Sequence, residues 1–394
     1  MSNIPKLRFP EFNGEWEEKK LSDIMTRLTR KNSNNESSRA LTISSVDGLI
    51  DQGEFFKKQI ASKDTSGYYL LKKGDFAYNK SYSVGYDYGS IKRLDRYEDG
   101  VVSTLYICMT LTSDTNSDYL THYFDSMKWN KSVSEISAEG ARNHGLLNIP
   151  TESFFQTKHF LAPSLAEQQK IADFLSNVDS IITAETKILN TLQKKKKALM
   201  QKLFTQQLRF KSDDGTDFPT WEEKKLGECV EILDSQRKPI ESKERANRKG
   251  EYPYYGASGI IDYIDDYLFE GESILLGEDG ANIINRNSRL AFIATGKYWV
   301  NNHAHIMKAN ADNLNYFICE YLESLDYSKI CAGSAQPKLT QDVIRNLKIK
   351  APCKEEQQKI ADCLSSLDSL IQNQQKVVTT WQQRKKALLQ QMFI

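Results

Sequence analysis

Two stretches of the chain carry apolar residues at helical spacing, and the stretches are copies of one another. Residues 167–204 and 356–393 align without a gap at an offset of 189 positions, with 21 identities in 38. Apolar residues recur every three or four positions, which predicts one apolar seam along each helix. The first seam comprises Ile171, Phe174, Leu175, Val178, Ile182, Leu189, Leu192, Leu199 and Leu203. The second comprises Ile360, Leu364, Leu367, Ile371, Val378, Trp381, Leu388 and Met392. The fixed offset indicates an internal tandem duplication.

Neither stretch contains Pro or Gly, so each is expected to form an unbroken helix about 57 Å long. Pro163 and Pro352 precede the two helices, and Glu167 and Glu356 near the helix starts suit the positive end of a helix dipole. A helix of this length cannot bury its seam alone. Each helix therefore needs a partner.

The part of the chain before each helix begins with the same two short motifs, which we call the opening segment. Leu-Arg-Phe at residues 7–9 and Trp-Glu-Glu-Lys-Lys-Leu at 16–21 recur at 208–210 and 221–226. The duplicated unit is thus an opening segment, a variable domain and a long helix. We predict four parts, which are the first domain at 1–162, the first helix at 163–205, the second domain at 206–351 and the second helix at 352–394.

Within the domains, short apolar runs separated by Gly and Asp predict strands and turns. In the first domain, residues 68–78 indicate strand, turn and strand, 101–111 a buried strand, and 118–129 a helix. In the second, we expect strands within 252–259, 260–268, 273–276, 290–294 and 299–307, and a helix at 313–325. A loop of small residues follows each helix, at 137–143 and 332–338. We therefore predict an α+β protein with two mixed domains.

Composition limits the class of protein. The chain has 394 residues, 39% of them hydrophobic, and a net charge of +1, with no apolar run long enough to span a membrane. The first residues lack the profile of a signal peptide, so we expect a cytoplasmic location. Six cysteines without a CxxC pair argue against a zinc site and a disulfide framework, so no metal site is predicted.

Several stretches then indicate a family. YPYYGASGIIDYIDDYLFEGE at 252–272, LLGEDGA at 275–281 and WVNNHAHIMK at 299–308 accompany the two variable domains and the repeated EQQKIA helix. Together they resemble the specificity subunit of type I restriction-modification enzymes. The first variable domain lacks the YYGASG and NNHAH stretches, so its assignment depends on its position, its opening segment and its ending.

The resemblance implies that each variable domain is a target recognition domain that reads one half of a split site in double-stranded DNA. It implies that the two long helices pack antiparallel as a spacer and dock two modification subunits, with restriction or translocase subunits joining through the complex. S-adenosylmethionine, ATP and Mg would then be bound by partner subunits. The residues expected to pair the helices and dock subunits are Ile171, Val178, Leu192, Leu199, Ile360, Leu367, Trp381 and Leu388.

The chain lacks a GxGxxG, a GxxxxGK[ST] and an Asn-Pro-Pro-aromatic tetrapeptide, so we predict a non-catalytic subunit. A self-sufficient methyltransferase or nuclease, and a coiled-coil protein scaffold, are the alternatives. Glu278 and Asp279 with His303 and His305 could suggest metal binding or a general base. The two histidines alternate as strand residues on one face would, and buried hydrogen bonding or a DNA-facing loop is the favoured interpretation.

Candidate DNA contacts follow from aromatic, basic and amide side chains in turns. In the first domain they are Lys80, Tyr82 and Tyr86, and Arg142 and Asn143 of the small-residue loop. In the second domain they are Tyr254, Tyr255 and Ser258, the turn residues Arg286, Asn287 and Arg289, and Gln336 and Lys338 of the matching loop.

Polar positions on the long helices leave two questions open. The runs Lys194–Lys197 and Arg384–Lys386 are either solvated helix faces or contacts with a partner subunit or with DNA phosphate. Glu185 and Gln374 interrupt the seams near their centres. They either form a polar layer that sets the register of the helix pair or face solvent.

Overall fold

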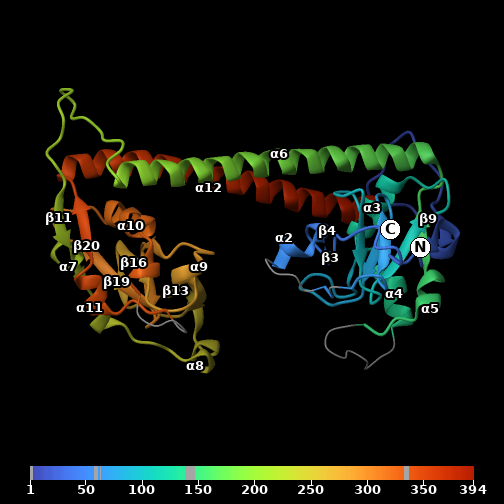
Figure 1. The fold of residues 1–394 in the computed structure, drawn as a ribbon, viewed down its shortest axis with the longest axis horizontal. Coiled ribbons are helices and arrows are strands. Elements are labelled where there is room, and N and C mark those ends of the chain that lie inside the picture. The colour runs from blue at the N-terminus through green and yellow to red at the C-terminus, as the bar shows by residue number, and fades with distance from the viewer. Residues whose placement is uncertain (1–2, 57–60, 63, 138–146, 332–336) are drawn as a thin grey trace. The chain divides into compact units, whose positions relative to one another are not determined.

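The computed structural model describes residues 3–56, 61–62, 64–137, 147–331 and 337–394 (Figure 1). Residue contacts divide the chain into two compact units. Unit 1 is Met1–Thr186 with Lys376–Ile394, and unit 2 is Lys187–Gln375. Each unit holds one variable domain and a part of both long helices, α6 (Leu165–Phe204) and α12 (Lys354–Met392). The two predicted long helices are confirmed.

Unit 1 contains ten strands among its described residues. They are β1 (Glu17–Lys20), β2 (Met25–Arg27), β3 (Leu41–Ser44), β4 (Gly48–Asp51), β5 (Tyr69–Lys72), β6 (Phe76–Asn79), β7 (Ser90–Arg93), β8 (Asp99–Val102), β9 (Ile107–Leu111) and β10 (Lys158–Leu161). Its short helices are α1 (Leu21–Ile24), α2 (Gln52–Phe56), α3 (Ser117–Asp125), α4 (Asn130–Ile136) and α5 (Thr151–Phe155). The strands form sheets in the orders β2-β9-β6-β7, β1-β10, β3-β4 and β5-β8, all antiparallel.

Unit 2 is built from a second set of strands. They are β11 (Glu222–Lys225), β12 (Val230–Ile232), β13 (Lys249–Gly256), β14 (Gly259–Ile264), β15 (Phe269–Glu270), β16 (Ser273–Gly277), β17 (Ala291–Ala294), β18 (Lys297–Val300), β19 (Ala304–Ala309) and β20 (Lys348–Ala351). Its helices are α7 (Leu226–Cys229), η1 (Asp234–Gln236), α8 (Ser242–Ala246), α9 (Asn282–Asn285), α10 (Asn315–Ser324), η2 (Tyr327–Lys329) and α11 (Gln341–Arg345). The sheet orders are β12-β19-β16-β17, β11-β20 and β14-β13-β18-β15.

The two units repeat one topology. The order β2-β9-β6-β7 in unit 1 matches β12-β19-β16-β17 in unit 2, and the strand of the opening segment pairs with the last strand of its domain in both. The units differ in their remaining strands, where unit 2 has the long hairpin β13–β14 and a parallel pairing of β13 with β18. The α+β class is therefore confirmed, and one fold carries two different sets of loops.

The main core of each unit joins a domain to both long helices. In unit 1, Trp16 of the opening segment and Tyr78 of β6 share a cluster with Leu175 of α6 and with Phe393 at the end of α12. In unit 2, Trp221 and Phe317 cluster with Leu203 of α6 and Ile360 of α12. Because the first part of α6 meets the last part of α12 in unit 1, and the reverse holds in unit 2, the helices pair antiparallel in each unit (Figure 1).

Some sequence predictions were wrong in detail. Residues 299–307 form two strands, β18 and β19, because the amide oxygen of Asn301 accepts a hydrogen bond from the His303 backbone N–H (2.8 Å) and makes a turn. The helix expected at 118–129 ends at Asp125, and Met127 has a left-handed φ of 62°. Apolar spacing continues past the end of α3 to Met127 and concealed that break, whereas Asn301 and Asn302 are residues that favour a turn and were included in one strand.

None of the helices in the described part of the chain combines the length and the apolar character that crossing a membrane requires.

His159 in β10 gives unit 1 a predicted sensitivity to acid. The Thr157 hydroxyl donates to the Phe154 carbonyl oxygen (2.6 Å) and can accept from His159 Nε2 (2.8 Å), which leaves Nδ1 to accept from the Tyr123 hydroxyl (2.9 Å). Burial lowers the pKa of His159 from 6.5 to about 4. Because the folded state disfavours the proton, this contribution to stability is present above pH 6.5 and is lost as the pH falls toward 4.

From these values, lowering the pH from 7 to 5 should cost about 2 kcal/mol of unfolding free energy through His159. Replacing His159 with Gln removes the titrating group and should remove that share of the pH dependence. Denaturant unfolding of both proteins at pH 7 and pH 5 measures the difference. An equal loss of stability in the two proteins would contradict the assignment.

Candidate nucleic-acid interface and helix faces

The first glutamate of each EQQKIA motif fastens the opening segment to the long helix. In unit 1, the buried Glu167 carboxylate accepts two hydrogen bonds from Arg8, at 2.7 and 2.8 Å, and one from the indole N–H of Trp16 at 3.2 Å. The hydrogen bond to Glu167 raises the pKa of Arg8 above its usual value. A forked guanidinium fits both carboxylate oxygens, so this contact fixes orientation as well as distance.

Unit 2 repeats this contact with its own residues. Glu356 is fully buried and accepts from Arg209 at 3.1 and 2.7 Å and from the Trp221 indole at 3.1 Å. The hydrogen bond to Glu356 raises the pKa of Arg209. The two copies of the opening segment therefore supply the arginine and the tryptophan that each repeat glutamate binds.

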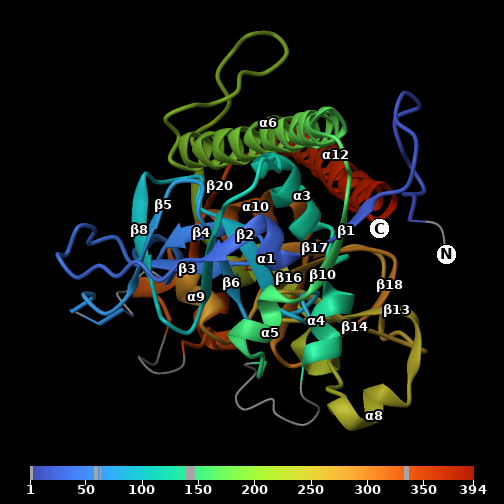
Figure 2. The same ribbon diagram turned by 90° about the vertical axis from the view of Figure 1, so that its right-hand side faces the viewer.

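The next residue of each motif, a glutamine, joins the helix to the domain. Gln168 accepts from the backbone N–H of Asn116 (2.8 Å), just before α3, and donates to the Ala162 carbonyl (2.8 Å). Gln357 accepts from the N–H of Leu314 (3.0 Å), just before α10, and donates to Asn313 Oδ1 (2.9 Å). Figures 1 and 2 both show α3 beside α6. Glu-Gln at the start of each helix thus sets how each domain attaches.

The residues predicted to pair the helices divide into two groups. Ile171, Val178 and Ile360 are buried, as a pairing seam requires. Leu192, Leu199, Leu367, Trp381 and Leu388 are half-buried. Three of the eight, Val178, Trp381 and Leu388, line an apolar groove in unit 1, so they also belong to an accessible surface.

This groove runs between α6 and α12 in unit 1 and has a volume of about 440 Å³. Phe174 and Ile181 of α6, each 37% exposed, lie on it, and Val377, one helical turn before Trp381 in α12, is 38% exposed. The equivalent positions in unit 2 are Cys363, Leu370 and Ile188, and Leu370 and Ile188 are 53% and 47% exposed. Each unit therefore keeps the same set of exposed apolar positions, which we call the outer stripe.

The loop between β6 and β7 carries the first set of candidate DNA contacts. Tyr82 is 47% exposed and Tyr86 is half-buried. Lys80 is half-buried, its carbonyl oxygen accepts from the Leu147 N–H (3.0 Å), and burial lowers the pKa of its ammonium group. The tip beyond them contains Val84, which is 92% exposed. The loop is therefore anchored at its base and exposed at its tip.

The three candidate DNA contacts at the end of β13 and in the turn that follows it differ in exposure. Tyr254 is fully buried, and its hydroxyl accepts from the Ile240 N–H (3.0 Å), so it is a core residue and cannot contact DNA in this structure. Tyr255 is half-buried, with its ring 5.8 Å from that of Phe292. Ser258 is exposed at the turn. Strand alternation explains the difference, since neighbouring side chains face opposite sides of a sheet.

The two arginines of the turn after α9 form ion pairs within the protein. Arg286 pairs with Glu323 (2.8 Å) and donates to its backbone oxygen (2.6 Å). Arg289 pairs with the buried Glu320 and donates to the Ala291 carbonyl (3.1 Å). Asn287 is exposed between them. Both guanidinium groups would have to leave these ion pairs to reach a base, so their DNA contact stays a prediction.

The two small-residue loops are described only in part. Arg142, Asn143 and Gln336 lie outside the described residues, so their predicted DNA contacts stay predictions. Lys338 is 51% exposed and its ammonium group lies 3.2 Å from Glu278. Residue 338 also bridges to Asp279 through the backbone, which places the end of this loop beside the Gly-Glu-Asp-Gly turn.

The His303 and His305 cluster is a hydrogen-bonding network. His303 lies in the turn before β19 and pairs with Asp279 (2.9 Å), whereas His305 is buried and lies 2.6 Å from Asp234. The alternation predicted that both histidines lie on one strand face, and this was wrong because His303 lies outside β19. His305 Nε2 is 2.8 Å from the Leu339 carbonyl, so neither ring nitrogen is open for a metal. Glu278 is occupied by Arg237 at 2.9 Å.

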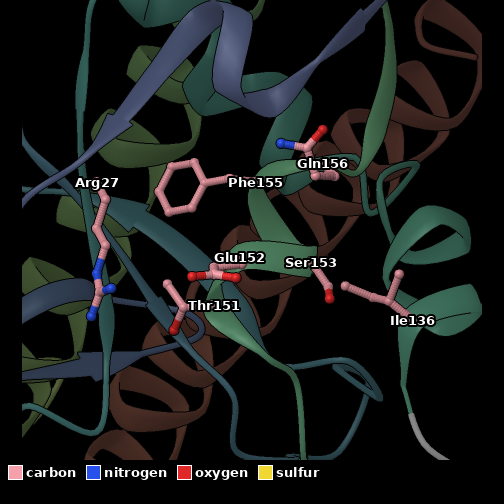
Figure 3. A pocket seen from close by; sticks show the side chains of 7 residues that line it. All are labelled: Arg27, Ile136, Thr151, Glu152, Ser153, Phe155 and Gln156. Atoms are coloured by element: carbon pink, nitrogen blue, oxygen red, sulfur yellow. The ribbon is translucent and has the colours of Figure 1, made fainter.

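A hollow in unit 1 was not predicted from the sequence. It has a volume of about 730 Å³ and, as Figure 3 shows, it lies among residues of β2, α4 and α5. Its lining residues are Arg27, Ile136, Thr151, Glu152, Ser153, Phe155 and Gln156. Ile136 precedes the small-residue loop at 137–143, so the hollow borders a predicted DNA-reading segment. The lining residues come from separate parts of the chain and share no pattern that sequence could reveal.

Comparison with known proteins places this geometry in a family. The family model of the type I restriction modification DNA specificity domain matches residues 13–194 and again 219–380. A putative type I restriction enzyme specificity subunit from Haemophilus influenzae is 35% identical over 37% of this chain and 37% of its own length. The putative MjaX specificity subunit of Methanocaldococcus jannaschii is 25% identical over 98% of this chain and 95% of its own length.

A crystal structure of a type I restriction-modification S subunit from M. genitalium has the same fold, with a TM-score of 0.59 at 15% identity, covering 99% of both chains. The two family matches coincide with the two copies of the opening segment, domain and helix described above. The chain therefore belongs to the type I restriction modification DNA specificity family.

Proposed function

We propose that this chain selects the DNA site for a type I restriction-modification complex, with each recognition domain reading one half of a bipartite double-stranded target. The observation that carries the proposal is that the strand order β2-β9-β6-β7 recurs as β12-β19-β16-β17. The chain thus contains the same scaffold twice, with different loops. A repeated scaffold with different loops suits two half-sites of different sequence.

The helix pair is proposed to set the spacer between the half-sites. Both long helices continue without interruption through the division between the units, at Thr186 in α6 and at Gln375 in α12. A continuous helix is a stiff connection with a fixed rise per residue. Glu185 and Gln374, both half-buried beside this division, stay candidates for a polar layer that sets register.

For the first half-site we propose contacts from Lys80, Tyr82 and Tyr86 and from Arg142 and Asn143. The exposed tip of the β6–β7 loop supports the first three, because its base is held by the Leu147 N–H and its end is accessible. For the second half-site we propose Ser258, Asn287, Lys338 and Gln336, with Tyr255 at a half-buried position. Side chains with amide or guanidinium groups suit base edges in the major groove.

The outer stripe is the proposed docking face for modification subunits. It is apolar, adjoins the seam residues Val178, Trp381 and Leu388, and recurs once in each unit, as two identical partners would require. Helix-in-groove packing is the contact that fits such a stripe. Restriction or translocase subunits would join through the modification subunits.

Placing aspartate on the outer stripe should remove one modification subunit at a time. Ile181→Asp should weaken one binding site at least tenfold, and adding Leu370→Asp should weaken the second, because a carboxylate would be buried without a partner. Native mass spectrometry counts the subunits bound per chain. Thr183→Asp, an exposed polar position on α6, is the control. Two bound subunits in the double variant would rule out this face.

We further propose that the chain itself catalyses no reaction and works in the cytoplasm. S-adenosylmethionine, ATP and Mg would be bound by the partner subunits. The family match supports neither of the alternatives, a self-sufficient methyltransferase or nuclease and a scaffold that binds only proteins. The purified chain with added cofactors should neither methylate nor cut DNA.

Genome-wide methylation mapping tests the proposed function. A host that carries this chain with its modification subunits should methylate a single bipartite sequence with a fixed gap. The same host without this chain should lack that methylation. Methylation that is unchanged when the chain is removed would contradict the proposal.

A further inference from the structure

Each unit contains a chain of ion pairs that runs from its recognition domain to both long helices. In unit 2, Arg289, two residues before β17, pairs with Glu320 of α10. Glu320 lies 2.8 Å from the ammonium group of Lys196 in α6, and Lys196 lies 2.6 and 2.7 Å from the two oxygens of Asp368 in α12. Tyr316 of α10 also donates a hydrogen bond to Asp368.

Unit 1 contains the corresponding chain. Lys92 of β7 lies 2.7 Å from Asp125 of α3. Asp125 lies 3.8 Å from Lys385 of α12, and Lys385 lies 2.7 Å from Asp179 of α6. His122 of α3 also lies 3.9 Å from Asp179. Domain and helix pair are thus joined by alternating charges here too.

The two helix members of each chain correspond in position and in sign. The domain members come from matching elements but from different positions, because the contacts of Asn116 with Gln168 and of Leu314 with Gln357 align Glu320 with His122 and Asp125 with Glu323. Lys196 and Lys385, and likewise Asp179 and Asp368, are 189 positions apart and identical in the two repeats. On the domain side, β7 and β17 occupy the same edge of matching sheets, and α3 and α10 both precede a small-residue loop. The domains share little sequence, yet in both a carboxylate of the domain contacts the lysine of the repeated helix, Lys196 or Lys385, and a cation of the domain contacts that carboxylate.

The lysines and Glu320 are largely removed from water, whereas Asp179 and Arg289, at the ends of the two chains, are 41% and 40% exposed. The side chains of Lys196 and Glu320 are 7% and 2% exposed, and those of Lys92 and Lys385 are 13% and 18% exposed. Burying ion pairs seldom adds net stability, because desolvation offsets the attraction, but it penalises every arrangement that separates the charges. Such a contact selects one orientation among several that apolar packing alone would allow.

We propose that these two ion chains are docking keys that fix the orientation of each recognition domain on the helix pair. The inference rests on the proposed function, because orientation matters through the gap between the half-sites. Asp125 and Glu320 are the positioning residues on the domain side. A domain transplanted onto these helices must bring a carboxylate that meets Lys385 or Lys196.

The two docking keys also differ in side-chain length, so each fits its own position on the helix pair better than the other position. Unit 2 uses the longer pair Arg289 and Glu320, and unit 1 uses Lys92 and Asp125. The carboxylate lies 2.8 Å from its repeat lysine in unit 2 and 3.8 Å in unit 1. A domain moved from one position to the other would therefore meet the same lysine at a different distance.

The test measures how well the assembled complex distinguishes gap lengths. The chain with its modification subunits is given duplexes that carry both mapped half-sites and gaps of native length or one base pair longer or shorter. Lys196→Met or Glu320→Gln should lower the preference for the native gap at least tenfold. The double variant should regain thermal stability over the single variants, since no buried charge of that pair is left alone, but should not regain the gap preference.

Controls separate positioning from folding. Lys187→Met changes an exposed lysine of the same helix and should leave the gap preference unchanged. In unit 1 the test variants are Lys385→Met and Asp125→Asn, and Lys376→Met, at an exposed lysine of α12, is their control. Should the neutral variants fail to fold, Glu320→Asp keeps the charge and shortens its reach, and should still lower the preference. A double variant with wild-type gap preference would overturn the docking keys. Absence of any bipartite methylation by the wild-type complex would instead overturn the proposed function.

Discussion

Replacing Glu356 with leucine is expected to release the second opening segment from its helix and to destabilise unit 2 by about 3–5 kcal/mol, the cost of removing one partner of a buried ion pair. Glu356 is fully buried, and the change would leave the Trp221 indole N–H without its acceptor and the Arg209 guanidinium without its carboxylate partner, with the Phe218 and Pro219 carbonyls as its remaining acceptors among the described residues. Glu167→Leu should have the same effect on unit 1, through Arg8 and Trp16.

Hydrogen exchange resolves the two units in one experiment. In Glu356→Leu, amides of β11 and α10 should exchange faster while those of β1 and α3 keep wild-type rates, because local opening follows local stability. Glu355→Leu is the matched control, since Glu355 is the exposed neighbour and surface changes usually shift stability by less than about 0.5 kcal/mol. If both variants exchange alike, the buried contact does not hold the opening segment.

Lengthening both helices at equivalent points should change the gap in the target without changing the half-sites. Four residues inserted after Thr186 and four after Gln375 add about 6 Å of helix, or roughly one to two base pairs of DNA. These positions are 189 apart and coincide with the division between the units, so the pairing inside each unit is preserved. Methylation mapping reads the new gap directly.

The insertion has its own control. Four residues added within the exposed stretch 212–216 of the second opening segment, where Ser212 and Thr216 close a tight turn, should leave the gap unaltered. A gap that stays the same after the helix insertions would show that something other than the helices sets the spacing.

The sequence predicted the repeated parts of the fold far better than the variable parts. Helix bounds, the duplicated opening segments and the fold class could be predicted because the 189-residue offset shows every important position twice. The turn at Asn301 was missed because the apolar residues on both sides of it were joined into one strand, although Asn301 and Asn302 favour turns.

Side-chain roles were harder to predict, because they depend on contacts distant in sequence. Lys196 belongs to a run of four lysines that resembles a solvated face, yet it is buried between Glu320 and Asp368. Arg289 looked like a base-reading residue in a polar turn and instead pairs with Glu320, 31 positions away. The one usable signal was the identity of Lys196 with Lys385 and of Asp179 with Asp368 across the repeats.

Exchanging one recognition domain tests the central claim most directly. Residues 227–351 are replaced with the same segment of another family member that carries a carboxylate at the Glu320 position, and the methylated sequence is mapped in a host with the modification subunits. One half-site should change while the other half-site and the gap are retained. A change in both half-sites, or in neither, would contradict the assignment of one half-site to each domain.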